Sequence, residues 1–111
     1  MQDFKYSLII TIVNKGFSND VMEAARAEGV SGGTVMRARG TAEKEVTKFM
    51  GFTIEPEKDI VLVLVENEKR AATIKAIHAK AGLGTKGHGF TFSLPVKDVI
   101  GGFRLNNKEQ E

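Results

Sequence analysis

The sequence predicts an α+β fold in which two helices cover one face of a four-stranded antiparallel sheet. Segments with strand and helix patterns follow one another in the order β-α-β-β-α-β, which corresponds to two split βαβ units. The 111 residues suffice for one domain and leave no room for a second core. We therefore expect a single domain over residues 1–104, followed by a polar tail over residues 105–111.

The first half of the chain supplies a strand, a helix and a second strand. Residues 4–13 form an apolar strand pattern with large side chains on both faces. Ser18 is expected to cap a helix that ends at Gly29. Residues 33–39 then alternate in polarity as a second strand.

A long connection over residues 40–58 opens the second half of the chain. Its apolar residues predict at most one helical turn, since Gly51 and Pro56 interrupt the helical spacing. We expect residues 41–57 to form a mobile loop. The unbroken apolar run at 60–65 then predicts a central strand that is covered on both faces.

A second helix and a last strand complete the order. Asn67 is expected to cap the helix, and residues 89–96 form the strand. The apolar stripe of this helix consists of Ala71, Ile74, Ile77 and Ala81. Because both helices cover the same face of the sheet, the other face is left bare, and we expect copies of the chain to pack sheet against sheet.

Composition excludes several classes of protein. The 16 basic and 14 acidic residues are interspersed without a polybasic tract, so nucleic-acid binding is not expected. Phe90 and Phe92 share a strand face, as in sheets that stack RNA bases, but no basic patch accompanies them. No segment is long and apolar enough to enter a membrane, and the N-terminus lacks a signal-peptide pattern, so a cytoplasmic protein is expected.

Catalytic residues are not predicted either. The chain has no cysteine, which excludes thiolate metal sites and cysteine nucleophiles. Its histidines are His78 and His88, and no carboxylate cluster accompanies them, so no metal site is expected. Acylphosphatases share the β-α-β-β-α-β order but need an arginine in the loop after the first strand, where this chain has NKGFS. We therefore expect a non-enzymatic protein.

Two clusters of glycines precede strands and are candidates for a ligand site. Both lie in helix-to-strand connections, which we expect at the same end of the sheet. Glycines there let backbone N–H groups converge on an anion, and Lys86 and His88 would add donors. The alternative is that the glycines only end helices and turn the chain. The clusters consist of Gly29, Gly32 and Gly33, and of Gly82, Gly84, Gly87 and Gly89.

Two segments carry a resemblance to the P-II signal-transduction family. EGVSGGTVMRARG (28–40) resembles the family's G-x-x-G-x-T-V entry to its second strand, and GHGFTFSLPV (87–96) resembles its G-D-G-K-I-F-V-L-P-V segment. The resemblance implies a ferredoxin-like subunit in a homotrimer that packs on the sheet. It also implies that ATP or ADP binds between subunits, and that a target protein, either an enzyme or a membrane transporter, is regulated in nitrogen metabolism.

The resemblance also assigns roles to individual residues. Residues 41–57 would be the T-loop, which contacts the target protein, and Lys58 would contact a 2-oxoglutarate-like effector. The nucleotide-binding residues would be Gly29, Gly32, Thr34, Gly40, Gly84, Lys86, Gly87, His88, Gly89 and Arg104. The target-binding anchors would be Val46, Phe49, Met50 and Phe52, unless these side chains fold back onto the sheet as core.

The chain departs from the family pattern at the expected phosphate site. Thr85 and Phe90 stand where the family has lysines, and Gly101 and Phe103 stand where it has arginines. Charge-assisted contacts are about twice as strong as neutral ones, so these changes weaken the case for the usual sensing of Mg-ATP and 2-oxoglutarate. We expect ATP, ADP or AMP as the effector. The alternative is a P-II-like binding module without ATP that senses another small molecule or a metal, or that acts by protein contact only.

Overall fold

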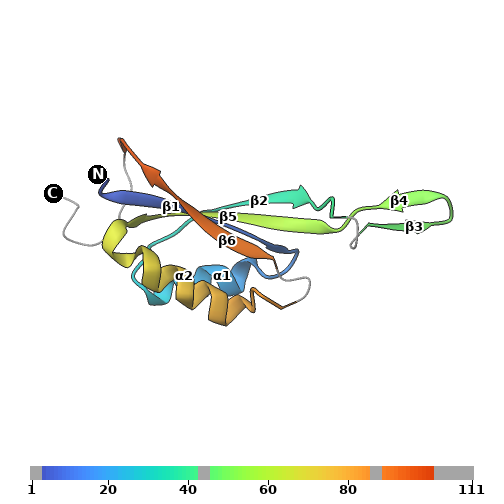
Figure 1. Ribbon diagram of the computed structural model, residues 1–111, viewed down its shortest axis with the longest axis horizontal. Helices are drawn as coiled ribbons and strands as arrows, with labels where there is room; N and C mark the ends of the chain where they lie inside the picture. Colours follow the sequence, from blue (N-terminus) through green and yellow to red (C-terminus); the bar gives the residue numbers. More distant parts are fainter. Residues whose placement is uncertain (1–3, 43–45, 86–88, 102–111) are drawn as a thin grey trace.

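A computed structural model describes residues 4–42, 46–85 and 89–101 of the chain. Figure 1 shows a twisted sheet with two helices on one side and a narrow hairpin that projects from one end. The elements are β1 (Tyr6–Asn14), α1 (Ser18–Ala27), β2 (Thr34–Arg39), β3 (Thr47–Phe49), β4 (Phe52–Ile54), β5 (Glu57–Glu66), α2 (Asn67–Ala81) and β6 (Phe90–Val96). The main sheet has the order β2-β5-β1-β6 with antiparallel neighbours, so the predicted fold class is confirmed.

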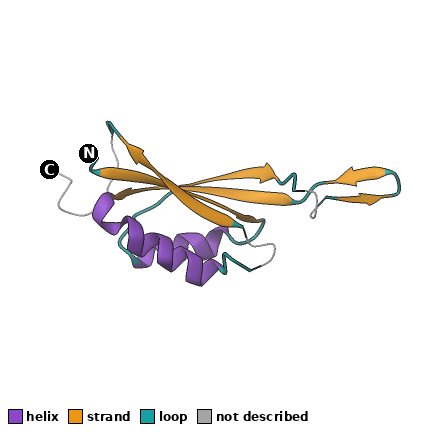
Figure 2. Ribbon diagram, viewed as in Figure 1, coloured by secondary structure: helices purple, strands orange, loops and turns teal. Residues whose placement is uncertain are grey.

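The core lies between the sheet and the two helices, which Figure 2 shows on the same face of the sheet. Alternate residues of β1 and β5 are buried there, and Ile9 pairs directly with Val63. The fully buried large side chains include Ile9, Val13, Val21, Val61, Val63 and Ile77. Burial of one such side chain stabilises the fold by about 1.5–3 kcal/mol, so this layer holds the domain together.

Both helices begin differently from the expectation. Ser18 and Asn67 are the first residues within α1 and α2, and neither helix has a side-chain hydrogen bond at its cap. The carboxamide oxygen of Asn67 instead accepts a hydrogen bond from the Ser7 hydroxyl, which ties the start of α2 to β1. The predicted end of α1 is correct, because Gly29 follows the helix with a φ of +96°.

The buried face of α2 differs by one residue from the predicted stripe. Ile77 and Ala81 are buried, and Ile74 packs against the core, but Ala71 is exposed. Thr73 is fully buried in its place. Its hydroxyl donates to the Lys69 carbonyl at 2.7 Å, which satisfies the polar group inside the core.

The sheet face opposite the helices is apolar. Ile10 lies in register between Leu62 of β5 and Phe92 of β6, and on the same face Ile12 pairs with Phe90. No helix of the described chain covers this face, and Phe90 and Phe92 are 55% and 39% exposed. The central place of β5 is confirmed, but this protomer covers the strand on its helix side only.

The connection before β5 contains a β-hairpin, so the expected helical spacing of Phe49 and Met50 is wrong. Phe49 pairs with Phe52 across a two-residue turn. Met50 and Gly51 have φ angles of +53° and +86°, and a type I′ turn requires positive φ at both positions. One backbone hydrogen bond with helical spacing, from Val46 to the Ala42 carbonyl, precedes the hairpin. Residues 43–45 lie outside the described chain.

Candidate functional site

Several sequence-predicted residues lie at one end of the sheet, which we call the hairpin end. There β6 begins at Phe90 opposite Ile12, and Lys58 of β5 pairs with Asn14, the last residue of β1. The N–H of Gly40 donates to the Pro56 carbonyl at 2.7 Å, and this contact joins the two segments of the chain at the base of the β3–β4 hairpin, which we call the hairpin stem. The hairpin end therefore brings together Lys58, Gly40 and the loop that leads into β6.

The end of that loop is fixed against β1 by Gly89. Its φ is +105°, and a Cβ at this position would lie 1.8 Å from the carbonyl oxygen of Ile12. Immediately after it, the Thr91 hydroxyl contacts the hydroxyl of Thr11 at 2.9 Å and donates to the Ile10 carbonyl at 3.1 Å. The loop therefore enters β6 in close backbone contact with β1, and this contact is possible only for glycine.

The described first half of the loop ends α2. Gly82 has a left-handed conformation with a φ of +66°, and Leu83 donates its N–H to the His78 carbonyl. The N–H of Thr85 donates back to the Gly82 carbonyl, so both N–H groups are engaged by backbone carbonyls of α2 and of the loop. A Cβ on Gly84 would lie 3.1 Å from the His78 ring. Gly82 and Gly84 thus form a helix-ending turn, as the alternative reading predicted.

Part of the predicted phosphate site lies outside the described residues. The positions of Lys86, Gly87 and His88 are not described, nor is that of Arg104. The anion cradle therefore stays a prediction for these residues. Thr85 and Gly89 are the described residues on either side of residues 86–88.

The first glycine cluster does not meet the second within one protomer, so the expectation that both lie at the same end of the sheet is wrong. The cluster of Gly29 and Gly32 leads into β2 at Thr34, on one edge of the sheet, whereas the loop to Gly89 leads into β6 on the other edge. The two strands also run in opposite directions. Three strand spacings separate the edges, a distance of about 14 Å.

Local structure explains two glycines of the first cluster. A Cβ on Gly33 would lie 2.6 Å from the Leu62 carbonyl oxygen. A Cβ on Gly29 would lie 2.6 Å from the Nζ of Lys69, which donates to the Glu28 carbonyl at 3.2 Å. Gly33 is therefore required by close packing against the β5 backbone, whereas Gly29 is favoured by its φ of +96°, because the flexible Lys69 side chain can move away from a Cβ.

Lys58 lies on the apolar face of the sheet, at its hairpin end. The residue is 8% exposed, and its Nζ donates to Oδ1 of Asn14 at 2.7 Å. The acceptor is the amide oxygen of Asn14, and this contact holds the ammonium group in place. The lysine that the resemblance assigns to an effector is thus fixed near the glycine loop.

Ion pairs occupy the other face of the hairpin end. Lys15 lies 2.9 Å from Glu57, Arg37 lies 3.0 Å from Asp59, and Arg39 lies 3.5 Å from Glu55. The hydrogen bond and the positive charge of Lys15 hold the pKa of the Glu57 carboxyl below its ordinary value. Sequence reasoning missed these pairs. The burial of Asp59 could have been predicted, because the residue shares a strand face with three valines that are buried.

The predicted target-binding anchors are exposed on the hairpin. Phe49, Met50 and Phe52 are 62%, 82% and 73% exposed, so the alternative in which they fold back onto the sheet is wrong for these three. Val46 is half-buried before β3. Phe49 and Phe52 form a cross-strand pair and therefore share one face of the hairpin with Ile54.

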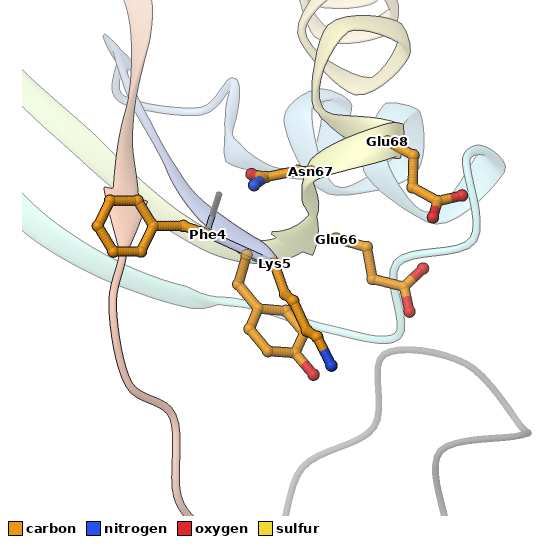
Figure 3. A pocket seen from close by; sticks show the side chains of 6 residues that line it. Phe4, Lys5, Glu66, Asn67 and Glu68 are labelled. Carbon is orange, nitrogen blue, oxygen red and sulfur yellow. The ribbon is translucent and has the colours of Figure 1, made fainter. Parts of the chain in front are cut away.

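A shallow pocket lies away from the hairpin end, where β1 and α2 begin. Figure 3 shows the carboxylates of Glu66 and Glu68 on the same side of this hollow. The lining residues are Phe4, Lys5, Tyr6, Glu66, Asn67 and Glu68. None of them is a sequence-predicted site residue.

A metal-binding cluster and a membrane-spanning helix are both absent from the described part of the chain. It contains no group of three or more histidines and carboxylates that could hold a metal ion. None of its helices has both the length and the apolar composition of a membrane span.

Comparison with known proteins relates the chain to one family. The family model for nitrogen regulatory protein P-II matches residues 6–102. Among solved structures, PII of Arabidopsis thaliana bound to citrate is similar with a TM-score of 0.67 and 26% sequence identity, over 98% of this chain and 86% of that chain. No curated protein sequence matches the chain.

Proposed function

Because the chain belongs to the nitrogen regulatory protein P-II family, we propose that it is a signal-transduction protein whose homotrimer binds a small effector between subunits. The proposed domain covers residues 1–104, with a polar tail at 105–111. The hairpin region over residues 41–57 is proposed to contact the regulated protein. The observation that carries the proposal is that the two glycine clusters lie on opposite edges of one sheet.

Opposite edges favour a site that two protomers share. In a closed ring of identical subunits, one patch of each subunit meets a different patch of the next. The β2 edge of one protomer would then face the β6 edge of its neighbour. Residues Gly29, Gly32 and Thr34 of one subunit, with Gly40 at the hairpin base, would complete a site with Gly84, Lys86, Gly87, His88, Gly89 and Arg104. The assignment of these residues to one subunit or to its neighbour is also proposed.

The apolar sheet face supports the homotrimer. Large side chains exposed on it are Met36, Phe90, Phe92 and Leu94, with exposed fractions between 39% and 55%. Monomeric proteins rarely leave a contiguous patch of this kind in water. Packing three such faces around one axis would cover the patch and bring the sheet edges together.

An adenine nucleotide, ATP, ADP or AMP, is the proposed effector. Lys58 and Lys86 would supply positive charge, and backbone N–H groups of the loop would supply neutral donors. The related Arabidopsis structure contains citrate, a small polycarboxylate, so a carboxylate ligand belongs in the same test. Mg²⁺ and 2-oxoglutarate are not proposed as obligatory ligands, because Lys44 stands near the position of the family's glutamine beside the metal.

The proposed target is a protein, either an enzyme or a membrane transporter, in a cytoplasmic pathway of nitrogen metabolism. The exposed side chains of Phe49, Met50 and Phe52 support this part, since hot spots of interfaces are formed by large apolar anchors. Val46 at the start of the hairpin would add to the same surface. No catalytic role is proposed for any residue, and neither nucleic acid nor a lipid bilayer is proposed as a partner.

Calorimetry with ATP, ADP, AMP, citrate and 2-oxoglutarate tests the effector. We expect binding of at least one nucleotide, and we expect Lys58→Met to weaken it by about tenfold, because it removes one charge-assisted contact. Lys5→Met is the matched control, since it removes the same charge at the opposite end of β1. Failure of every nucleotide to bind at millimolar concentration would contradict the nucleotide part.

The alternative function, a P-II-like module that does not bind ATP, is favoured by one specific observation. In the described half of the glycine loop, the N–H groups of Leu83 and Thr85 donate to the carbonyls of His78 and Gly82, so these groups are not available to a phosphate. Such a module would sense another small molecule or a metal, or would act by protein contact only. Native mass spectrometry of the purified trimer, searched for a retained ligand, distinguishes the two functions.

A further inference from the structure

One carboxylate joins three segments at the base of the hairpin. Oδ2 of Asp59 accepts a hydrogen bond from the N–H of Gly16 at 3.2 Å, and Oδ1 accepts one from Nε of Arg37 at 3.0 Å. Gly16 belongs to the turn between β1 and α1, Arg37 belongs to β2, and Asp59 follows the hairpin on β5. Each carboxylate oxygen is therefore bound to a different segment.

The Asp59 carboxylate is buried on a largely apolar strand face, with Glu57 as a charged neighbour on the same face. Its exposed fraction is 4%, and the same face of β5 continues with Val61, Val63 and Val65, which are buried. Carboxylates are rarely this buried unless they are paired, and apolar replacements of buried ion pairs are often equally stable. Stability alone therefore does not account for an aspartate at this position.

Neighbouring contacts converge on the same stretch of β5. The N–H of Lys15 donates to the Glu57 carbonyl at 3.1 Å, and the two side chains form an ion pair. On the other face of the sheet, Lys58 donates to Asn14. The end of β1 and the turn that follows it thus contact residues 57–59 on both faces of the sheet. These residues come directly after the hairpin in the chain.

We propose that Asp59, with Gly16 and Arg37, forms a latch that fixes the direction in which the β3–β4 hairpin leaves the sheet. A two-stranded hairpin has no core of its own, so its direction depends on the stem, where Gly40 donates to the Pro56 carbonyl. The latch links this stem to the β1–α1 turn, which closely follows Ile12 and Val13, the residues against which Gly89 packs. A bound ligand that displaces this turn would therefore change the direction in which the hairpin leaves the sheet.

The inference deepens the proposed function, on which its regulatory meaning rests, but its test measures the hairpin stem alone. Amide hydrogen exchange of Gly40 is followed by NMR in the full-length protein. In Asp59→Asn and in Arg37→Met, we expect exchange at Gly40 to be about tenfold faster than in the wild type. The double variant should exchange no faster than Asp59→Asn, because both substitutions break the same link. Core amides such as that of Val63 should keep wild-type rates.

Glu23→Gln is the matched control, because it removes an ion pair with Lys80 that joins the two helices away from the hairpin. Exchange at Gly40 should not change in this variant. If Asp59→Asn loosens the whole core, Arg37→Met still tests the latch, because the Arg37 side chain is 55% exposed and its replacement leaves the core intact. If the Gly40 amide exchanges at the wild-type rate in Arg37→Met, the proposed latch is wrong. That result would leave effector binding and the trimer untouched, so it is distinct from failure of the proposed function.

Discussion

At the scale of single residues, two glycines with nearly the same backbone conformation have different surroundings. Gly16 has a φ of +102°, and a Cβ placed on it would meet nothing within 4 Å. Gly89 has a φ of +105°, but a Cβ there would overlap the carbonyl oxygen of Ile12. The pair therefore separates the cost of a left-handed backbone from the cost of steric exclusion.

Alanine substitution of these glycines tests that separation. Gly16→Ala should lower the free energy of unfolding by about 1–2 kcal/mol, which is the cost of left-handed backbone for an L residue. Gly89→Ala should lower it by more than about 3 kcal/mol, since β1 and β6 must also move apart. Urea unfolding at one fixed protein concentration measures both values. Equal losses would mean that the contact between Gly89 and Ile12 is not obligatory.

A second prediction at this scale concerns the carboxyl of Glu57. The hydrogen bond and charge of Lys15 lower its pKa in the folded protein, so the pair stabilises the fold above the ordinary pKa of a glutamate. This stabilisation is lost as the pH falls through the lowered pKa. NMR titration should find the Glu57 pKa below its ordinary value, and Lys15→Met should raise it.

Lys5→Met serves as the control for that titration, because Lys5 lies just before the other end of β1. This variant should leave the Glu57 pKa unchanged. The same Glu57 pKa in Lys15→Met and in the wild type would show that the 2.9 Å contact between Lys15 and Glu57 does not persist in solution.

At the scale of elements, the hairpin depends on a turn that its sequence does not favour. Type I′ turns prefer asparagine, aspartate or glycine at their first central position, where this chain has Met50. A methionine with positive φ is uncommon, and here its side chain is 82% exposed. The strained and exposed methionine is consistent with selection for contact with a partner rather than for hairpin stability.

Substitution of Met50 distinguishes these two requirements. Met50→Asn should stabilise the hairpin by about 1 kcal/mol, and exchange of the hairpin amides should slow by about fivefold. Met50→Val should have the opposite effect, because a branched Cβ is least compatible with positive φ. Core amides should be unaffected in both variants. Equal exchange in the two variants would exclude the type I′ turn.

The same residue explains why the hairpin was not predicted from sequence. The alternating and unbroken apolar runs at residues 4–13 and 60–65 carried enough signal to predict β1 and β5 and hence the fold. The hairpin strands are only three residues long, and their turn lacks the usual Asn-Gly signal. Asp59 was missed for a related reason, because a carboxylate at the start of a strand normally marks its exposed end.

At the scale of the whole molecule, strand direction determines where a ligand can bind. The glycine clusters were predicted from the sequence, but the expectation that they lie at the same end of the sheet was wrong, because their location depends on the directions of β2 and β6. Both follow helices, yet β2 runs parallel to β1 and β6 runs antiparallel to it. A single protomer therefore carries one cluster on each edge of the sheet, and the proposed site that combines both clusters would need a neighbouring subunit.

The apolar sheet face offers the sharpest test of that assembly. Phe92 is 39% exposed and lies in register with Ile10, near the middle of the face. Phe92→Glu would bury a charge without a partner in each of three subunits, so we expect the trimer to dissociate at least about 100-fold more readily. Sedimentation should find a species near the subunit mass of 12.1 kDa in place of one near three times that mass.

The matched control is Ala79→Glu, which adds the same charge on the exposed outer side of α2. This variant should remain trimeric. Circular dichroism of Phe92→Glu should stay close to that of the wild type, because the core lies on the other face of the sheet, among residues such as Ile9 and Val63. A trimer that survives Phe92→Glu would place the subunit interface elsewhere. The two glycine clusters would then have no route to a common ligand through this face.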